Sequence, residues 1–91
     1  MNCTEFEYSN HCLQKVMERD ISIDAIEKVI KNGEIIKDYP DDKPYPSVLL
    51  LGFVNKKPLH VVTAYFRKKC IVITAYYPDS KIWKSDFKTK K

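Results

Sequence analysis

Five residues have the chemical types needed for general acid–base chemistry on RNA, and they lie in separate parts of the sequence. They are His11, Arg19, His60, Thr74 and Tyr76. In metal-independent cleavage a base takes the proton of a ribose 2′-hydroxyl, a cation stabilises the charge on the phosphorane, and an acid protonates the leaving 5′-oxygen. The histidines and the tyrosine suit the proton transfers, Arg19 suits the cation, and Thr74 can hold a phosphate oxygen.

The same residues have ordinary structural interpretations. His11 can be a surface residue of a helix, and Arg19 near a helix C-terminus interacts favourably with the helix dipole. Thr74 and Tyr76 are residue types that β-strands prefer. No metal site and no cofactor are expected, because the two histidines come without a carboxylate pair and without the short spacings of metal ligands.

Capping residues and hydrophobic periodicity predict the elements that must position these side chains. Ser9 and Ser22 are expected to cap two helices, over residues 10–19 and from residue 23 to Gly33, where Gly33 is expected in the left-handed conformation. Strands are expected over residues 34–39, 47–54, 59–66 and 70–77, with a short edge strand over 4–8 and a Pro-rich loop over 40–46. The fold class predicted is α+β, with two N-terminal helices packed on one face of a three- to four-stranded antiparallel sheet.

The last two predicted strands form a hairpin that can pair in two registers. If Phe66 pairs with Cys70, His60 lies opposite Tyr76. If the pairing slips by one residue, His60 lies opposite Tyr77. The turn contains neither Gly nor Asn, so its chemistry does not choose between the registers.

Charge is distributed unevenly along the chain. The formal net charge is +4, but residues 1–46 carry six Lys and Arg against ten Asp and Glu, whereas residues 47–91 carry ten against two. A basic second half favours a polyanionic partner. The residues expected to contact RNA are Lys15, Arg67, Lys68, Lys69, Lys84 and Lys88.

The length of 91 residues predicts a single domain over residues 1–91, with a core over about 9–86 and a basic tail over 84–91. Trp83 is expected to cover the end of the core. The longest apolar run, residues 48–54, is far shorter than the roughly 20 residues of a membrane span, and the N-terminus has no apolar targeting segment. A cytoplasmic location is therefore expected. Three cysteines without C-x-x-C spacing favour reduced thiols.

Several short motifs, taken in order, resemble a known family. They are Ser9-x-His11, Arg19 followed by Asp20-Ile21-Ser22, Asn32-Gly33-Glu34-Ile35-Ile36, Gly52, Leu59-His60-Val61-Val62, and Ile73-Thr74-Ala75-Tyr76-Tyr77-Pro78-Asp79 with Trp83. Over roughly residues 9–86 they resemble the small prokaryotic family catalogued as domain of unknown function 4258. That family is similar in fold to the RelE/ParE toxins and to other small metal-independent ribonucleases. The resemblance implies a toxin-like or ribonuclease-like protein with an antitoxin partner, and its motif positions fall on His11, Arg19, His60, Thr74 and Tyr76. RelE-type enzymes tend to rely on Arg, Lys and Tyr rather than on His.

The leading hypothesis is a metal-independent endoribonuclease of toxin type, a monomer or homodimer that works on RNA without a membrane partner. The alternative is a non-catalytic binding module that docks on a protein or nucleic acid, as ParE-like toxins do. A third hypothesis is a small structural protein whose Tyr39, Tyr45 and Trp83 cover another subunit. The packing of the helices on the sheet decides whether His11 and the strand residues converge.

Overall fold

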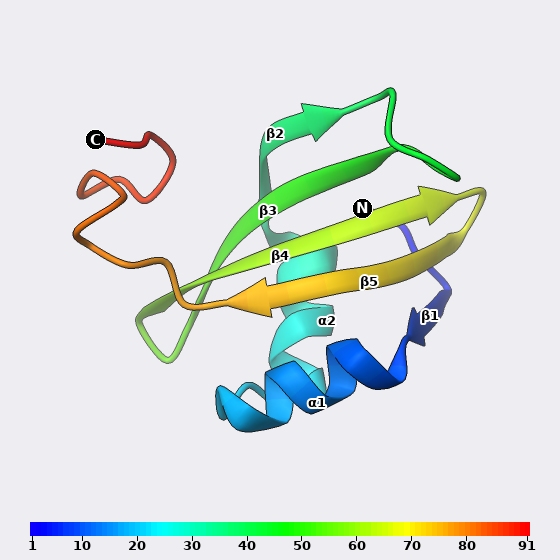
Figure 1. Ribbon diagram of the computed structural model, residues 1–91, viewed down its shortest axis with the longest axis horizontal. Coiled ribbons are helices and arrows are strands. Elements are labelled where there is room, and N and C mark those ends of the chain that lie inside the picture. The colour runs from blue at the N-terminus through cyan, green and yellow to red at the C-terminus, as the bar shows by residue number, and fades with distance from the viewer.

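A computed structural model describes all of residues 1–91 and contains two helices and five strands. The elements are β1 (Glu5–Tyr8), α1 (Asn10–Glu18), α2 (Ile23–Asn32), β2 (Glu34–Tyr39), β3 (Ser47–Val54), β4 (Lys57–Phe66) and β5 (Lys69–Tyr76). Both helices lie on one side of the sheet, and the C-terminal segment, residues 77–91, lies beyond the end of β5 (Figure 1). The predicted order of elements is confirmed. No helix is long and apolar enough to span a membrane.

The predicted three- to four-stranded antiparallel sheet is wrong. The protein has one five-stranded mixed sheet in the order β1-β5-β4-β3-β2, within an α+β fold. The strands β2 to β5 pair antiparallel with their neighbours, but β1 pairs parallel with β5, from Glu5 opposite Lys69 to Tyr8 opposite Val72. The sequence of four residues that forms β1 carries no signal for a partner strand some 60 positions away, so the parallel edge is a product of tertiary packing.

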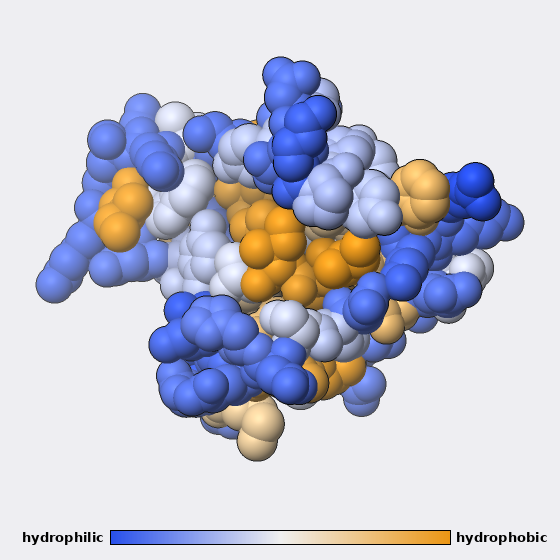
Figure 2. All heavy atoms as spheres, turned by 45° about the vertical axis from the view of Figure 1, so that its right-hand side comes forward, coloured by the Kyte–Doolittle hydropathy of each residue, from blue (hydrophilic) through white to orange (hydrophobic).

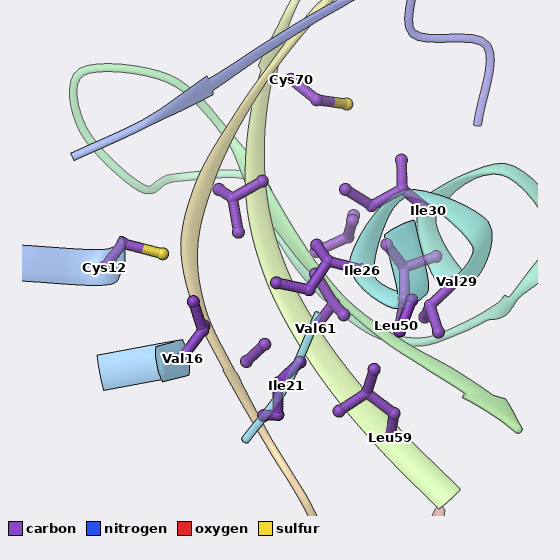
Figure 3. Packing of buried hydrophobic residues seen from close by; sticks show 14 residues of the cluster. Cys12, Val16, Ile21, Ile26, Val29, Ile30, Leu50, Leu59, Val61 and Cys70 are labelled. Carbon is purple, nitrogen blue, oxygen red and sulfur yellow. The ribbon is translucent and has the colours of Figure 1, made fainter. Parts of the chain in front are cut away.

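Local capping chemistry starts both helices as predicted. The Ser9 hydroxyl oxygen accepts a hydrogen bond from the Cys12 backbone N–H at 3.0 Å, and the Ser22 hydroxyl oxygen accepts one from Ala25 at 3.0 Å. Each bond satisfies a backbone donor that the first helical turn leaves without a partner. The apolar stripes of both helices then face the sheet. Figure 3 shows their side chains meeting those of the strands, and the cluster contains 14 buried residues.

Gly33 ends α2, but not in the left-handed conformation that the sequence predicts. Its φ of −75° and ψ of 171° are extended, and any residue can adopt them. The glycine is needed for space instead. A Cβ atom there would lie 2.8 Å from the backbone oxygen of Leu51 and against that of Val29.

We expect Gly33→Ala to lower the free energy of unfolding by about 1–3 kcal/mol, because two backbone segments must move apart to admit one methyl group. Urea denaturation followed by circular dichroism measures the change. Asn32→Ala, at the exposed position just before it, is the control and should stay close to the wild-type value. Equal urea midpoints for Gly33→Ala and the wild type would show that the close approach of the Val29 and Leu51 backbone oxygens to residue 33 does not make an added methyl group destabilising.

The hairpin of β4 and β5 adopts neither predicted turn. Phe66 pairs with Lys69 across a two-residue turn, in which Arg67 has a φ of 57°. A bulge at Ile73 then shifts the register by one residue, and His60 still comes to lie opposite Tyr76. Bulges add one residue to one strand of a pair and are set by packing rather than by a local sequence signal.

The cysteines also differ from the expectation of reduced thiols. A disulfide joins Cys3 and Cys70, whose Cα atoms are 5.8 Å apart, while Cys12 is free and buried. Because β1 pairs with β5, Phe6 lies opposite Cys70 and the residues just before β1 are carried next to it. The pairing therefore depends on the parallel edge that the sequence does not reveal.

Candidate functional site

His60 lies on the face of the sheet that points away from the helices, and it is completely buried. The neighbouring Val61 belongs to the core under the helices, so strand alternation turns His60 to the opposite face. The C-terminal segment covers the imidazole there. The Trp83 ring contacts it edge-on at 4.6 Å between centroids, with an interplanar angle of 86°. Trp83, which was predicted to cover the end of the core, is buried, and its ring packs on His60.

Both ring nitrogens of His60 have hydrogen-bond partners. Nε2 lies 2.8 Å from the carbonyl oxygen of Phe87, and Nδ1 lies 3.3 Å from the hydroxyl oxygen of Tyr76. A carbonyl oxygen only accepts, so Nε2 carries the hydrogen. In the neutral ring Nδ1 is then an acceptor, and the Tyr76 hydroxyl donates to it.

Burial sets the charge state of this pair. Burial lowers the pKa of His60, although the hydrogen bond to the Phe87 carbonyl opposes that change. Burial also raises the pKa of Tyr76. Both groups are therefore neutral near pH 7, with the Tyr76 proton held toward His60.

Arg19 joins the end of α1 to the open edge of β5. Its Nη1 donates to the Thr74 hydroxyl oxygen at 3.2 Å and to the Ala75 carbonyl oxygen at 2.9 Å. That carbonyl is available because β1 pairs with β5 only as far as Val72. Arg19 therefore gives a hydrogen-bond donor to a carbonyl group of β5 that has no partner strand, and this is a structural role. The same contact keeps a cation at that edge of the sheet.

Thr74 and Tyr76 bring these two pairs together. They are two residues apart on β5, so their side chains point to the same face with Cα atoms about 7 Å apart. The sheet register places Thr74 opposite Val62 and Tyr76 opposite His60. Because Thr74 accepts from Arg19, its own hydroxyl hydrogen is free to donate to another group. Four of the five predicted catalytic residues thus form one cluster at this end of β5.

His11 is not part of that cluster. It is exposed in the first turn of α1 and makes no hydrogen bond to another side chain. The rise of an α-helix, about 1.5 Å per residue, places its Cα about 12 Å from that of Arg19 along the axis. Between them Lys15 is half-buried and forms an ion pair with Glu18 at 3.6 Å. His11 and Lys15 therefore lie along α1, away from the cluster.

A hollow of about 550 Å³ opens between the α1–α2 connection and the beginning of β4, on the side of the sheet that the helices cover. Asp20 and Tyr77, the chain neighbours of Arg19 and Tyr76, line it together with Met17, Ile21, Lys57 and Leu59. The Tyr77 hydroxyl donates to the Asp20 carbonyl oxygen at 3.2 Å, and the Lys57 ammonium lies 4.9 Å from the Tyr77 ring centroid. The hollow therefore lies on the other face of the sheet from His60 and Tyr76, and none of the four clustered residues lines it.

The family model described as Domain of unknown function (DUF4258) matches residues 8–77. The chain belongs to this family. All five predicted catalytic residues lie inside the matched DUF4258 region, whereas Trp83 and Phe87, which cover His60, lie beyond it. No curated protein and no solved structure matches the chain. Sequence reasoning missed Phe87 because its contribution is a backbone carbonyl, for which the residue type gives no signal.

Five of the six basic residues of this DUF4258 protein that were predicted to contact RNA lie in two groups at opposite ends of the sheet, and Lys15 lies apart on α1. In the β4–β5 turn Arg67 and Lys68 are exposed, and Lys69 pairs with Glu7 at 2.8 Å. In the C-terminal segment Lys84 is exposed, and Lys88 pairs with Glu34 of β2 at 2.9 Å. No group of three or more His, Cys, Asp or Glu side chains is placed to hold a metal ion.

Proposed function

We propose that this DUF4258 protein is a metal-independent endoribonuclease of toxin type, which cleaves RNA by general acid–base catalysis at the end of β5. The observation that carries the proposal is the pair of side-chain contacts on alternate residues of that strand. Arg19 donates to Thr74, and Tyr76 donates to His60. A cation, a hydroxyl donor and a neutral phenol therefore lie within the reach of one phosphodiester.

The chemistry divides among these groups as follows. The 2′-oxygen attacks phosphorus, the bond between phosphorus and the 5′-oxygen breaks, and the products are a 2′,3′-cyclic phosphate and a 5′-hydroxyl. Arg19 and the Thr74 hydroxyl stabilise the charge on the non-bridging oxygens. Neutral Tyr76 turns its hydroxyl hydrogen from His60 Nδ1 to the leaving 5′-oxygen and protonates that oxygen. His60 holds the Tyr76 hydroxyl in place. The 2′-hydroxyl proton passes to solvent water, because His11 lies outside this cluster.

Further parts of the proposal concern the relatives of the protein, its partner and its location in the cell. They are a relationship in activity to the RelE/ParE toxins, a prokaryotic origin, a cognate antitoxin and a cytoplasmic location. An arginine, a threonine and a tyrosine at the site agree with the reliance of RelE-type enzymes on residues other than His. Disulfides rarely persist in a reducing cytoplasm, so in that setting Cys3 and Cys70 are thiols.

The test is cleavage of end-labelled RNAs in EDTA by the purified protein and by Thr74→Val, which removes a hydroxyl and keeps the side-chain shape. We expect cleavage by the wild type to leave cyclic phosphate ends, and Thr74→Val to slow it about 10- to 100-fold, as expected for one hydrogen bond to a charged group. Thr4→Val, at an exposed position before β1, is the matched control. Intact RNAs with the wild-type protein, beside an active control nuclease, would overturn the proposal.

A non-catalytic binding module is the second candidate, and one observation favours it. His60 is completely buried, and both its nitrogens are engaged, so it cannot itself reach a substrate in this arrangement. A module that holds RNA through phosphates binds less tightly as salt rises and releases no cleavage products. Titrations with labelled RNA at several salt concentrations, combined with the cleavage assay, separate the two candidates.

A further inference from the structure

The end of the sheet opposite His60 carries two stacked aromatic rings with a cation against them. Tyr45 precedes β3 and Phe66 ends β4, and their ring centroids are 4.9 Å apart with planes inclined by 27°. The guanidinium carbon of Arg67 lies 5.1 Å from the centroid of the Phe66 ring. Phe66 is 44% exposed, so this group lies at the surface rather than in the core.

Backbone pairing holds the group together. The Tyr65 N–H donates to the Pro46 carbonyl oxygen at 3.1 Å, which extends the pairing of β3 with β4 and brings Tyr45 beside Phe66. Arg67 follows in the tight turn, with a φ of 57°. The two rings are therefore positioned by the strands, whereas the Arg67 side chain lies at an exposed turn and can move.

The rings lie on the same face of the sheet as the catalytic cluster. Phe66 and His60 are six residues apart on β4, so their side chains share one face and are separated by about 20 Å. Val62 and Ala64 lie between them on that face, and the helices cover only the other one. Figure 2 shows an apolar patch in the middle of the molecule with hydrophilic residues around it.

Cations lie at both ends of this apolar face. Arg67 and Lys68 are exposed and form no ion pair, in contrast to Lys69, which Glu7 engages. At the other end are Arg19 and the lysines of the C-terminal segment. A ligand with apolar faces and regularly spaced negative charges matches this surface, and a single nucleic-acid strand has both.

We propose that Tyr45, Phe66 and Arg67 form a base-stacking site that selects single-stranded RNA and leads it along the sheet toward Thr74 and Tyr76. This inference rests on the proposed function for the choice of RNA. A base takes the place of the guanidinium over the exposed ring of Phe66, and Arg67 turns to the adjacent phosphate. Duplex bases are already stacked on one another, so a duplex cannot use the site. The distance of about 20 Å between the two ends of β4 spans a few nucleotides.

The test is fluorescence anisotropy with a short labelled oligonucleotide whose riboses are 2′-O-methylated, so that it binds but cannot be cleaved. We expect the wild type to bind the single strand more tightly than the matching duplex. Phe66→Ala should weaken single-strand binding about 5- to 100-fold, the range of one base–aromatic stack, and Phe66→Tyr should retain it. Phe53→Ala is the matched control, because Phe53 is 61% exposed at the other end of the sheet and has no aromatic or cationic partner.

The outcomes separate this inference from the proposed function. Equal affinities of Phe66→Ala and Phe53→Ala, or of single strand and duplex, would overturn the stacking site, even if unmethylated RNA is cleaved. A selective loss of affinity in Phe66→Ala without any cleavage of unmethylated RNA would support the stacking site and overturn the nuclease. If Phe66→Ala is unfolded by circular dichroism, the comparison of Phe66→Tyr with Phe66→Leu decides, since only the tyrosine keeps a ring to stack on.

Discussion

Tyr76→Phe is expected to slow RNA cleavage by about 10²- to 10⁴-fold, the usual contribution of a general acid. The substitution removes the only proton that Tyr76 can give to the leaving 5′-oxygen and keeps the aromatic ring. Its effect on folding should be small, because one hydrogen bond to His60 contributes about 0.5–1.5 kcal/mol. Initial rates with end-labelled RNA, together with urea denaturation of the same preparation, measure the two effects.

Tyr65→Phe is the matched control for Tyr76→Phe, because Tyr65 is a half-buried tyrosine of β4 that packs against the core on the other face of the sheet. It should cleave RNA at nearly the wild-type rate. The pH profile gives a second readout. Burial raises the pKa of Tyr76 above the ordinary value of about 10, so the wild-type rate should begin to fall only at a pH above 10. Equal rates for wild type and Tyr76→Phe would remove Tyr76 from the chemistry.

Trp83→Ala is expected to lower the free energy of unfolding by about 3–5 kcal/mol, the usual cost of truncating a buried aromatic side chain. Trp83 is 6% exposed, packs edge-on against His60 and holds the C-terminal segment over the sheet. A loss of this size is a large part of the total stability of a small protein. Urea denaturation followed by circular dichroism measures it, since the variant lacks the only tryptophan. Trp83→Phe keeps a ring at the same place and should recover about half of the loss.

The same variant should change how stability depends on pH. Burial lowers the pKa of His60 in the folded protein, so below pH about 6.5 the unfolded chain binds a proton that the folded protein does not. The free energy of unfolding of the wild type therefore falls as the pH drops through 6.5 and levels off below the folded-state pKa, with a slope of at most about 1.4 kcal/mol per pH unit from this group. Above pH 6.5 the group has no effect.

In Trp83→Ala the imidazole regains water, its pKa should rise toward 6.5, and the slope below that pH should shrink. Titration of the His60 ring protons by NMR follows the pKa directly. His60→Asn cannot be protonated in this pH range, so it gives the pH dependence of the free energy of unfolding without the contribution of His60. A wild-type slope equal to that of His60→Asn would show that the C-terminal segment leaves His60 open to solvent.

Local features of the fold could be predicted because the residues that cause them are close together in the chain. Ser9 and Ser22 bond to backbone groups three residues later, and the apolar spacing within each helix selects its buried face. The charge division between the two halves is a property of composition alone. Thr74 and Tyr76 are two positions apart, so strand alternation alone predicts that they share a face.

Other features could not be predicted because they join residues that are distant in sequence. The parallel pairing of β1 with β5 made the sheet five-stranded and brought Cys3 to Cys70. The hydrogen bond from Arg19 to Thr74 spans 55 residues. Contacts of this kind depend on how the whole chain packs, and the residue types alone do not predict them.

The sequence by itself determined the chemical groups of the candidate site and the local elements that bear them, because side-chain chemistry, capping and periodicity act within a few residues. Only the tertiary structure decided which groups meet. The bulge at Ile73 places Tyr76 opposite His60, and Arg19 binds the unpaired edge of β5. The C-terminal segment covers His60, whereas His11 lies outside the cluster. Each of these outcomes follows from the need to pair strand edges and to bury apolar rings, which is met by the folded chain as a whole.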